Sequence, residues 1–122
     1  MHPDLFKVWE EFTKTTKLNV FMVETARSEK KQAANVAKGA STTKRSRHVL
    51  SNNKSGRACA MDLAPCSADG KVIFWKRLDL FQQMNKEIMA AAARLGIPIE
   101  WGGVWKKFKD LDHWQLSWKV YP

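Results

Sequence analysis

Hydrophobic side chains recur at helical spacing in two parts of the chain. The first part, Pro3 to Thr13, places four large apolar residues on one face, namely Leu5, Val8, Trp9 and Phe12. The second and clearer part runs from Lys76 to Leu95, with Leu78, Phe81, Met84, Ile88, Ala92 and Leu95 on one face. Gly96 and Pro98 then supply signals that end a helix. Both patterns predict amphipathic helices whose apolar faces belong to the core.

Shorter apolar runs predict strands. They cover residues 18–24, 57–63, 97–101 and 113–118, and the apolar segment 72–75 could add another. In the last of the four, His113 and Gln115 alternate with Trp114 and Leu116. Since successive side chains of a strand point to opposite faces, His113 is expected to face a site while Trp114 packs behind it.

The segment between the first two predicted strands is polar. Ser28 is a good N-cap for a helix that runs to Lys38 and ends at Gly39, and 41–56 is rich in loop-forming residues. Helices mixed with short, mostly antiparallel strands predict an α+β fold. We expect a single small domain over residues 1–122, with a mostly antiparallel sheet flanked by helices.

Length and composition are consistent with one globular domain. The chain has 122 residues, of which 44% are hydrophobic, and a chain of this size buries roughly two-thirds of its unfolded surface. It has no apolar run near eighteen residues, so no membrane span is expected. The first residues lack the basic start and apolar stretch of a signal peptide. Cys59 and Cys66 lack C-x-x-C spacing, so reduced thiols are expected, with Cys59 a buried structural thiol, and a bridge between the two after release remains open.

Positive charge is concentrated in one segment. The net charge is +9, and residues 27–57 contain nine Lys or Arg and one acid, Glu29. Such a segment can bind nucleic acid, contact an anionic wall polymer or outer membrane, or simply be solvated. It contains no aromatic residue that could stack on bases, so no nucleic-acid partner is expected.

Three residues of zinc-ligand type stand in two short contexts. His48 follows Ser46 and Arg47, Asp62 follows the run that starts at Gly56, and His113 lies in Asp110-Leu111-Asp112-His113-Trp114-Gln115. Two histidines and one aspartate make an open ligand set, because a hydrolytic zinc keeps its fourth position for water. Asp110 is a carboxylate that could act on that water.

These contexts carry a family resemblance. The patterns S-x-H, G-x-A-x-x-D-L and D-x-x-H-[aromatic]-Q resemble the zinc D-alanyl-D-alanine peptidases, which share a fold with the hedgehog signalling domain. Within that family the chain is most similar to small phage endolysins that cut peptidoglycan between L-alanine and D-glutamate. The resemblance covers residues 20–116. It includes Arg27-Ser28 with Gln32, the step Gly39-x-Ser41, and Trp101-Gly102-Gly103.

The resemblance implies a role for each site residue. The expected zinc ligands are His48, Asp62 and His113. Asp110 would be the general base, and Arg27 would place positive charge near the carbonyl oxygen or a substrate carboxylate. Ser46 would orient the ligand loop or a substrate group, and Trp101 would be a wall of the cleft or a core residue.

The resemblance also implies partners and a location. The substrate would be bacterial peptidoglycan, and the protein would be a monomer in the host cytoplasm until a holin-type factor releases it. Three other functions remain open at this stage: a D-alanyl-D-alanine carboxypeptidase or dipeptidase on the same site, a non-catalytic wall-binding module, and a nucleic-acid-binding protein.

The chain departs from the family pattern at four points. His48 and Asp62 are fourteen residues apart where H-x6-D is commoner, so residues 49–55 read as an inserted surface loop. Val104 stands where an acid usually follows Trp-Gly-Gly. Asp112 stands where proline is frequent and adds a rival carboxylate. Asp110 is one methylene shorter than the glutamate of many relatives.

Overall fold

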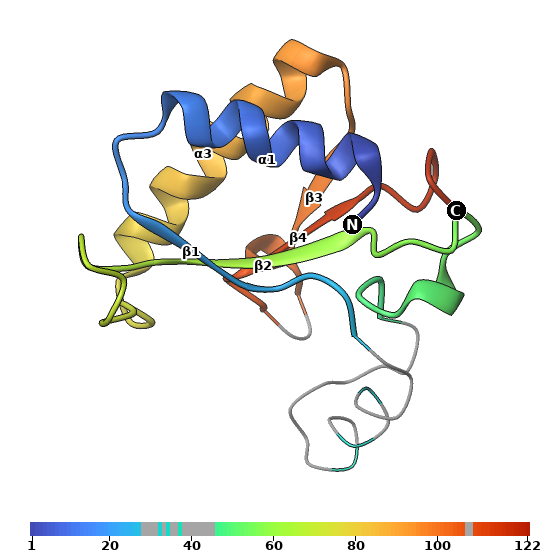
Figure 1. Ribbon diagram of the computed structural model, residues 1–122, viewed down its shortest axis with the longest axis horizontal. Helices are drawn as coiled ribbons and strands as arrows, with labels where there is room; N and C mark the ends of the chain where they lie inside the picture. Colours follow the sequence, from blue (N-terminus) through green and yellow to red (C-terminus); the bar gives the residue numbers. More distant parts are fainter. Residues whose placement is uncertain (28–31, 33, 35–36, 38–45, 107–108) are drawn as a thin grey trace.

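In the part of the chain that the structure describes, helices α1 and α3 lie on one face of a four-stranded antiparallel sheet (Figure 1). The computed structural model describes residues 1–27, 32, 34, 37, 46–106 and 109–122. The helices are α1 (Pro3–Thr15) and α3 (Leu78–Leu95), and the strands are β1 (Val20–Glu24), β2 (Ala60–Pro65), β3 (Ile99–Trp101) and β4 (His113–Leu116). Two short 3-10 turns, η1 (Leu50–Asn52) and η2 (Gly102–Val104), complete the elements. The predicted α+β class, with an antiparallel sheet and flanking helices, is confirmed.

The helices form where the apolar spacing predicts them. His2 accepts a hydrogen bond from the Asp4 amide at Nδ1 and caps α1, whose first residue is proline. Gly96, at φ +69°, ends α3 in the left-handed conformation that glycine adopts without strain. The predicted core faces are buried in their middle parts. The prediction was wrong for the two end positions of α3, because Leu78 is 48% exposed and Leu95 is 40% exposed.

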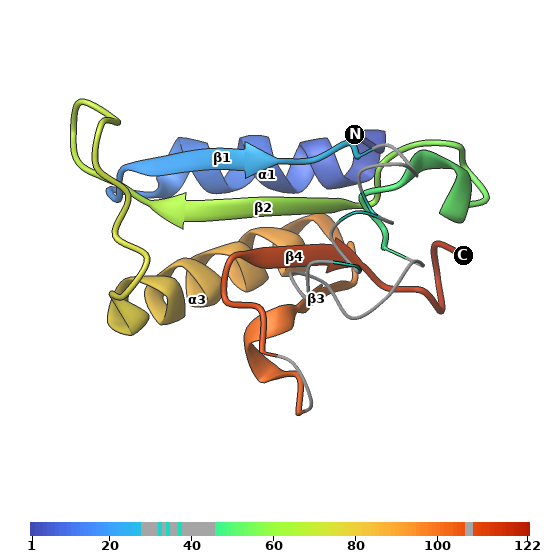
Figure 2. The ribbon, with the colours of Figure 1, turned by 90° about the horizontal axis from the view of Figure 1, so that it is seen from below.

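The sheet has the order β1-β2-β4-β3, with β2 buried along its whole length (Figure 2). Met61 and Leu63 of β2 join the core between the sheet and the helices. Asp62 therefore points to the other face, which carries neither helix (Figure 2). Asp62 pairs with His113 on β4 and with Glu24 on β1. Opposite residues of an antiparallel pair share a face, so these three polar residues lie together.

Two other sequence predictions have different outcomes. The segment 72–75 is not a strand, since only an isolated bridge joins Cys66 to Ile73. Most of the predicted helix 28–38 lies outside the described residues, as do Ser28, Gly39 and Ser41. Cys59 and Cys66 are both free and buried, which confirms the burial predicted for Cys59. No helix in the described ranges is long and apolar enough to span a membrane.

Two glycines after β3 let the chain pass a stacked pair of tryptophans. Trp101 is 7% exposed and stacks on Trp114, with ring centroids 6.0 Å apart. A Cβ on Gly103 would lie 2.2 Å from the Trp101 ring. A Cβ on Gly102 would lie 2.5 Å from the carbonyl oxygen of Asp110. The Trp-Gly-Gly sequence is thus explained by close packing.

Gly103→Ala should therefore destabilise the protein. The added methyl group must displace the Trp101 ring, and overpacking of this kind costs about 1–3 kcal/mol of unfolding free energy. Denaturant unfolding of the variant measures the loss. Val104→Ala, at a neighbouring side chain that is 69% exposed, is the matched control and should change stability little. Equal stabilities of the two variants would contradict this packing account.

Candidate metal centre

The structure brings the three predicted ligands together. His48 Nε2 lies 3.0 Å from Asp62 Oδ1 and 3.2 Å from His113 Nδ1, and the last two atoms are 3.2 Å apart. All three residues are buried, with exposures of 2%, 8% and 5%. Among the described residues, these three form the group that could hold a metal ion. Asp62 and His113 come from the paired strands β2 and β4, whereas His48 comes from the turn before η1.

The turn that carries His48 is fixed by local hydrogen bonds. The Ser46 hydroxyl accepts from the His48 amide at 3.2 Å, and the His48 carbonyl accepts from the Arg27 amide at 2.8 Å. Ser46 thus contacts the turn that carries His48, and the role expected for it stays a prediction. The inserted loop 49–55 folds around Asn53, whose side-chain amide donates to the carbonyls of Arg47, Val49 and Arg57. The insertion is therefore compatible with convergence of the ligands.

Arg47 anchors the same turn from inside the protein. Its side chain is 1% exposed and its guanidinium lies 3.8 Å from the centre of the Trp118 ring. It donates to Asn53 Oδ1 and to the carbonyls of Leu116 and Tyr121. Sequence reasoning did not single out Arg47, because its partners lie up to 74 residues away.

Each histidine ring of the cluster has a second nitrogen that forms a hydrogen bond outside the cluster. These hydrogen bonds decide which ring nitrogen is unprotonated and faces the other ligands. His48 Nδ1 lies 2.7 Å from the Thr25 carbonyl oxygen, which can only accept, so the proton of the neutral ring sits on Nδ1. His113 Nε2 lies 2.8 Å from Gln115 Oε1 and donates to it. His48 Nε2 and His113 Nδ1 consequently present lone pairs to the Asp62 carboxylate. Three acceptors this close repel one another unless a proton or a metal cation lies between them.

The dimensions and chemistry of this cluster fit zinc. Metal–nitrogen and metal–oxygen bonds of roughly 2.0–2.2 Å in a tetrahedral site separate the ligand atoms by about 3.3–3.5 Å. The observed separations of 3.0–3.2 Å are close to that value. Two imidazoles and one carboxylate are also a ligand set that a hydrolytic zinc accepts, with a position left for water.

Burial and charge act together on the two titrating ligands. Burial alone would raise the pKa of Asp62, but hydrogen bonds with His113 and His48 hold it well below its usual range. Burial alone would lower the pKa of His113, but the hydrogen bond and charge of Asp62 raise it above its ordinary value. Without metal, the Asp62 carboxylate therefore favours a protonated His113.

This coupling gives a prediction for the metal-free protein. The raised His113 pKa contributes stability that is fully present below its unfolded value of about 6.5 and is lost as pH rises through the folded value. The lowered Asp62 pKa contributes stability above about 3.9 that is lost only in strong acid. The unfolding free energy of zinc-free protein should thus fall from pH 6 towards alkaline pH. His113→Gln should flatten that fall in denaturant titrations, and an unchanged slope would contradict the assignment.

Arg27 lies beside the cluster, held by two partners. It forms an ion pair with Glu24 and donates to Gln32 Oε1, and one guanidinium nitrogen lies 3.8 Å from Asp62 Oδ2. A register irregularity in β1 between Met22 and Glu24 sets Glu24 opposite Asp62. The structure thus places Arg27 next to the second oxygen of the ligand carboxylate. Sequence reasoning missed Glu24, since the irregularity that aims it has no signature in the apolar pattern.

Asp110 and Asp112 form a pair of carboxyl groups beside the cluster. Burial, a hydrogen bond with Asp110 and the charge of Asp62 raise the pKa of Asp112 far above its usual range. The raised pKa of Asp112 favours its protonated form. The Asp110 carbonyl accepts from the His113 amide at 3.2 Å, and its amide donates to the Gly102 carbonyl at 2.9 Å. Neither carboxylate belongs to the three-residue group among the described residues.

The aromatic neighbour of the ligands is Trp105. Its ring centroid lies 5.1 Å from that of His113, and the residue is partly exposed. Trp101, predicted as a cleft wall or core residue, is buried in the core and donates to the Leu111 carbonyl at 2.8 Å. Sequence reasoning did not single out Trp105, which follows η2 without a recognisable motif.

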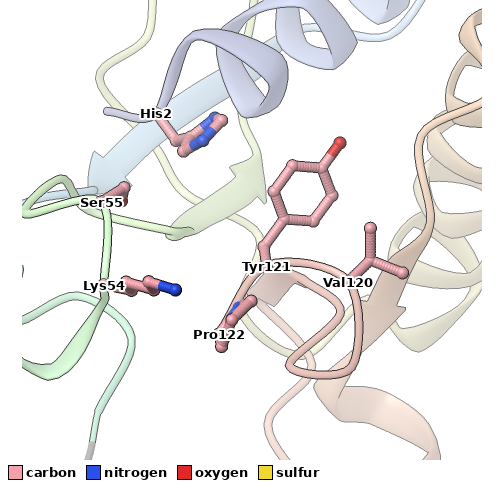
Figure 3. Close-up of a pocket in the computed structure, with 6 residues that line it drawn as sticks. All are labelled: His2, Lys54, Ser55, Val120, Tyr121 and Pro122. Carbon is pink, nitrogen blue, oxygen red and sulfur yellow. The ribbon is translucent and has the colours of Figure 1, made fainter.

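A separate hollow lies where the two ends of the described chain meet (Figure 3). It has a volume of about 260 Å³ and is lined by His2, Lys54, Ser55, Val120, Tyr121 and Pro122. It shares no residue with the His48–Asp62–His113 cluster. The converging ligand atoms, rather than this hollow, define the candidate site.

Comparisons with known proteins agree with this geometry. A family model described as phage L-alanyl-D-glutamate peptidase matches residues 1–116. The L-alanyl-D-glutamate peptidase of Listeria phage A118 is 34% identical over 111 residues, which are 91% of this chain and 35% of that protein. The chain thus spans about a third of the length of this relative. The crystal structure of Serratia marcescens L-Ala D-Glu endopeptidase ChiX matches with a TM-score of 0.83 and 32% identity, covering 98% of this chain and 83% of that one.

Proposed function

The chain belongs to the phage L-alanyl-D-glutamate peptidase family, and from that premise we propose that it is a zinc-dependent peptidoglycan endopeptidase. It would hydrolyse the L-alanyl-D-glutamate bond of stem peptides during host cell lysis. The observation that carries the proposal is the convergence of His48 Nε2, Asp62 Oδ1 and His113 Nδ1 within 3.2 Å. Lone pairs so arranged favour a metal ion.

The three converging residues would hold the zinc. When bound, zinc supplies a Lewis acid for the scissile carbonyl and lowers the pKa of a bound water to about 7. His48 stays oriented by the Thr25 carbonyl, and His113 by Gln115. Hydrogen bonds of this kind fix the ring that faces a metal and raise its basicity.

Asp110 would move the proton. Its carboxylate would accept a proton from the attacking water and deliver it to the leaving amine as the peptide C–N bond breaks. Asp112 supports this assignment because its raised pKa leaves it protonated, so that it donates a hydrogen bond to Asp110. Arg27 would stabilise the negative charge that develops on the carbonyl oxygen, or hold a substrate carboxylate. Glu24 and Gln32 fix its guanidinium for either role.

Both named relatives are L-alanyl-D-glutamate peptidases. They favour cleavage of the L-alanyl-D-glutamate bond over cleavage of the bond to the terminal D-alanine, which a carboxypeptidase would hydrolyse. Ligands and a base in one place also support an enzyme over a wall-binding module. The monomeric state, the holin-type factor, and accumulation in the host cytoplasm before release stay predictions. A wall-docking role for the basic segment also stays a prediction, because Lys30, Lys31, Lys38 and Lys44 lie outside the described residues.

Removal of the metal tests the proposal. The protein is treated with a chelator, and the chelator is then removed. This metal-free protein should produce no free amino groups from purified peptidoglycan, and addition of about one equivalent of zinc per chain should restore the hydrolysis. His2→Ala serves as the control: His2 is the N-cap residue before α1 and lies outside the cluster, so activity of this variant should respond to chelation and to zinc as that of the unchanged protein does. Full activity of chelated, metal-free protein would refute a zinc-dependent peptidase.

A further inference from the structure

A hydrogen-bonded chain runs outward from His113 to the edge of the sheet. His113 Nε2 lies 2.8 Å from Gln115 Oε1, and Gln115 Nε2 lies 3.1 Å from Glu100 Oε2. Glu100 and Gln115 are opposite residues of the antiparallel pair β3 and β4. Such residues have their side chains on the same face and close together. The sequence motif includes Gln115, but neither the motif nor the function proposed above assigns a role to Glu100.

An amide side chain can present either of its ends to a neighbouring ring. With Oε1 towards His113, Gln115 accepts the Nε2 proton and leaves Nδ1 bare in the cluster. With its NH2 group towards His113, Gln115 would donate to Nε2, and the proton of the neutral ring would have to move to Nδ1. That proton would sit on Nδ1, which lies 3.2 Å from both His48 Nε2 and Asp62 Oδ1, and it would compete there with a metal ion.

Glu100 removes this ambiguity. A carboxylate only accepts hydrogen bonds, so the NH2 group of Gln115 must face Glu100 and the amide oxygen must face His113. We infer that Glu100 is a positioning residue that holds His113, through Gln115, in the tautomer whose Nδ1 is free to bind a metal. The purpose of this device rests on the proposed zinc-dependent function, although the tautomer itself is a property of the metal-free protein.

The backbone beside Glu100 is held firmly enough for such a role. The next residue, Trp101, stacks on Trp114 and donates to the Leu111 carbonyl at 2.8 Å. Gln115 itself is 5% exposed, so its buried amide depends on hydrogen bonds with His113 and Glu100 more than on water. Glu100 thus approaches Gln115 from a fixed strand.

Glu100→Gln tests the inference, because an amide at this position can donate as well as accept and permits either orientation of Gln115. The matched control is Glu10→Gln, which makes the same change of charge at an exposed position of α1. Two readouts are needed: the ring tautomer of His113 from 15N NMR of metal-free protein at alkaline pH, and the Kd for Zn2+ from competition with a chelator. Glu100→Gln should mix the tautomers and weaken zinc binding by about tenfold, the lower end of such effects. Glu10→Gln should change neither.

A swapped pair provides a rescue. The double variant Glu100→Gln/Gln115→Glu places a carboxylate next to His113, where it accepts the Nε2 proton directly, and an amide behind it as donor. It should recover the single tautomer and most of the zinc affinity. An unchanged His113 tautomer in Glu100→Gln, or a double variant that stays as impaired as Glu100→Gln, would overturn the inference. The NMR readout reports on folded, metal-free protein, so it decides the matter even if the unchanged protein binds no zinc, a result that would refute only the proposed function.

Discussion

Asp62→Ala, His48→Ala and His113→Ala are each expected to lose nearly all bound zinc and all measurable peptidase activity. Each change removes one of three ligand atoms that converge within 3.2 Å. Loss of residues that only support a ligand costs 10–100-fold in metal affinity, so loss of a ligand should weaken zinc binding by more than about 100-fold. Metal analysis of the purified variants, with circular dichroism to confirm folding, measures the effect.

Asp79→Ala is the control for the aspartate variant. Asp79 is an exposed acid in the first turn of α3, paired with Arg77 and distant in sequence from the ligands. It should retain about one zinc per chain and full activity. Stoichiometric zinc in all three ligand variants would show that the cluster is not the metal site.

The second large effect is expected at Asp110. Asp110→Asn should keep its zinc and its fold but lose hydrolysis by about two orders of magnitude or more, as removal of a general base does. Asp112→Asn is the matched control within the same carboxyl pair. Because the raised pKa of Asp112 keeps it protonated, an amide that still donates to Asp110 should substitute for it with little loss. Initial rates on purified peptidoglycan compare the two.

The opposite outcome has a clear meaning. If Asp112→Asn is inactive and Asp110→Asn is active, Asp112 transfers the proton and the assignment to Asp110 is wrong. Asp112 is the second carboxyl group beside the ligands, so this comparison decides between the two.

The ligand set could be predicted because its residues stand in short motifs, and two of them, Asp62 and His113, lie on predictable strands. The alternation along 113–118 correctly placed His113 on one face and Trp114 and Leu116 in the core. The helices followed from apolar spacing, although Leu78 and Leu95 at the ends of α3 remain exposed. Apolar spacing identifies which face of a helix packs on the core, but how much of that face is buried depends on tertiary contacts.

The supporting residues could not be predicted, because they depend on contacts across the sheet. Glu24 lies opposite Asp62 through an irregularity in β1, and Glu100 meets Gln115 through the register of β3 with β4. Arg47 donates hydrogen bonds to the carbonyls of Leu116 and Tyr121, which are far away along the chain. Neither periodicity nor local motifs encode which strand positions become opposite, so such partners become visible only in the folded structure.

The identity of the bond that is cut tests the central claim most directly. Purified peptidoglycan digested by the zinc-loaded protein should yield fragments with D-glutamate as the new N-terminus and no new reducing sugar ends, as read by mass spectrometry and end-group assay. Asp110→Asn should yield none of these fragments in the same time. New reducing ends would contradict a peptidase, and release of terminal D-alanine alone would contradict cleavage of the L-alanyl-D-glutamate bond.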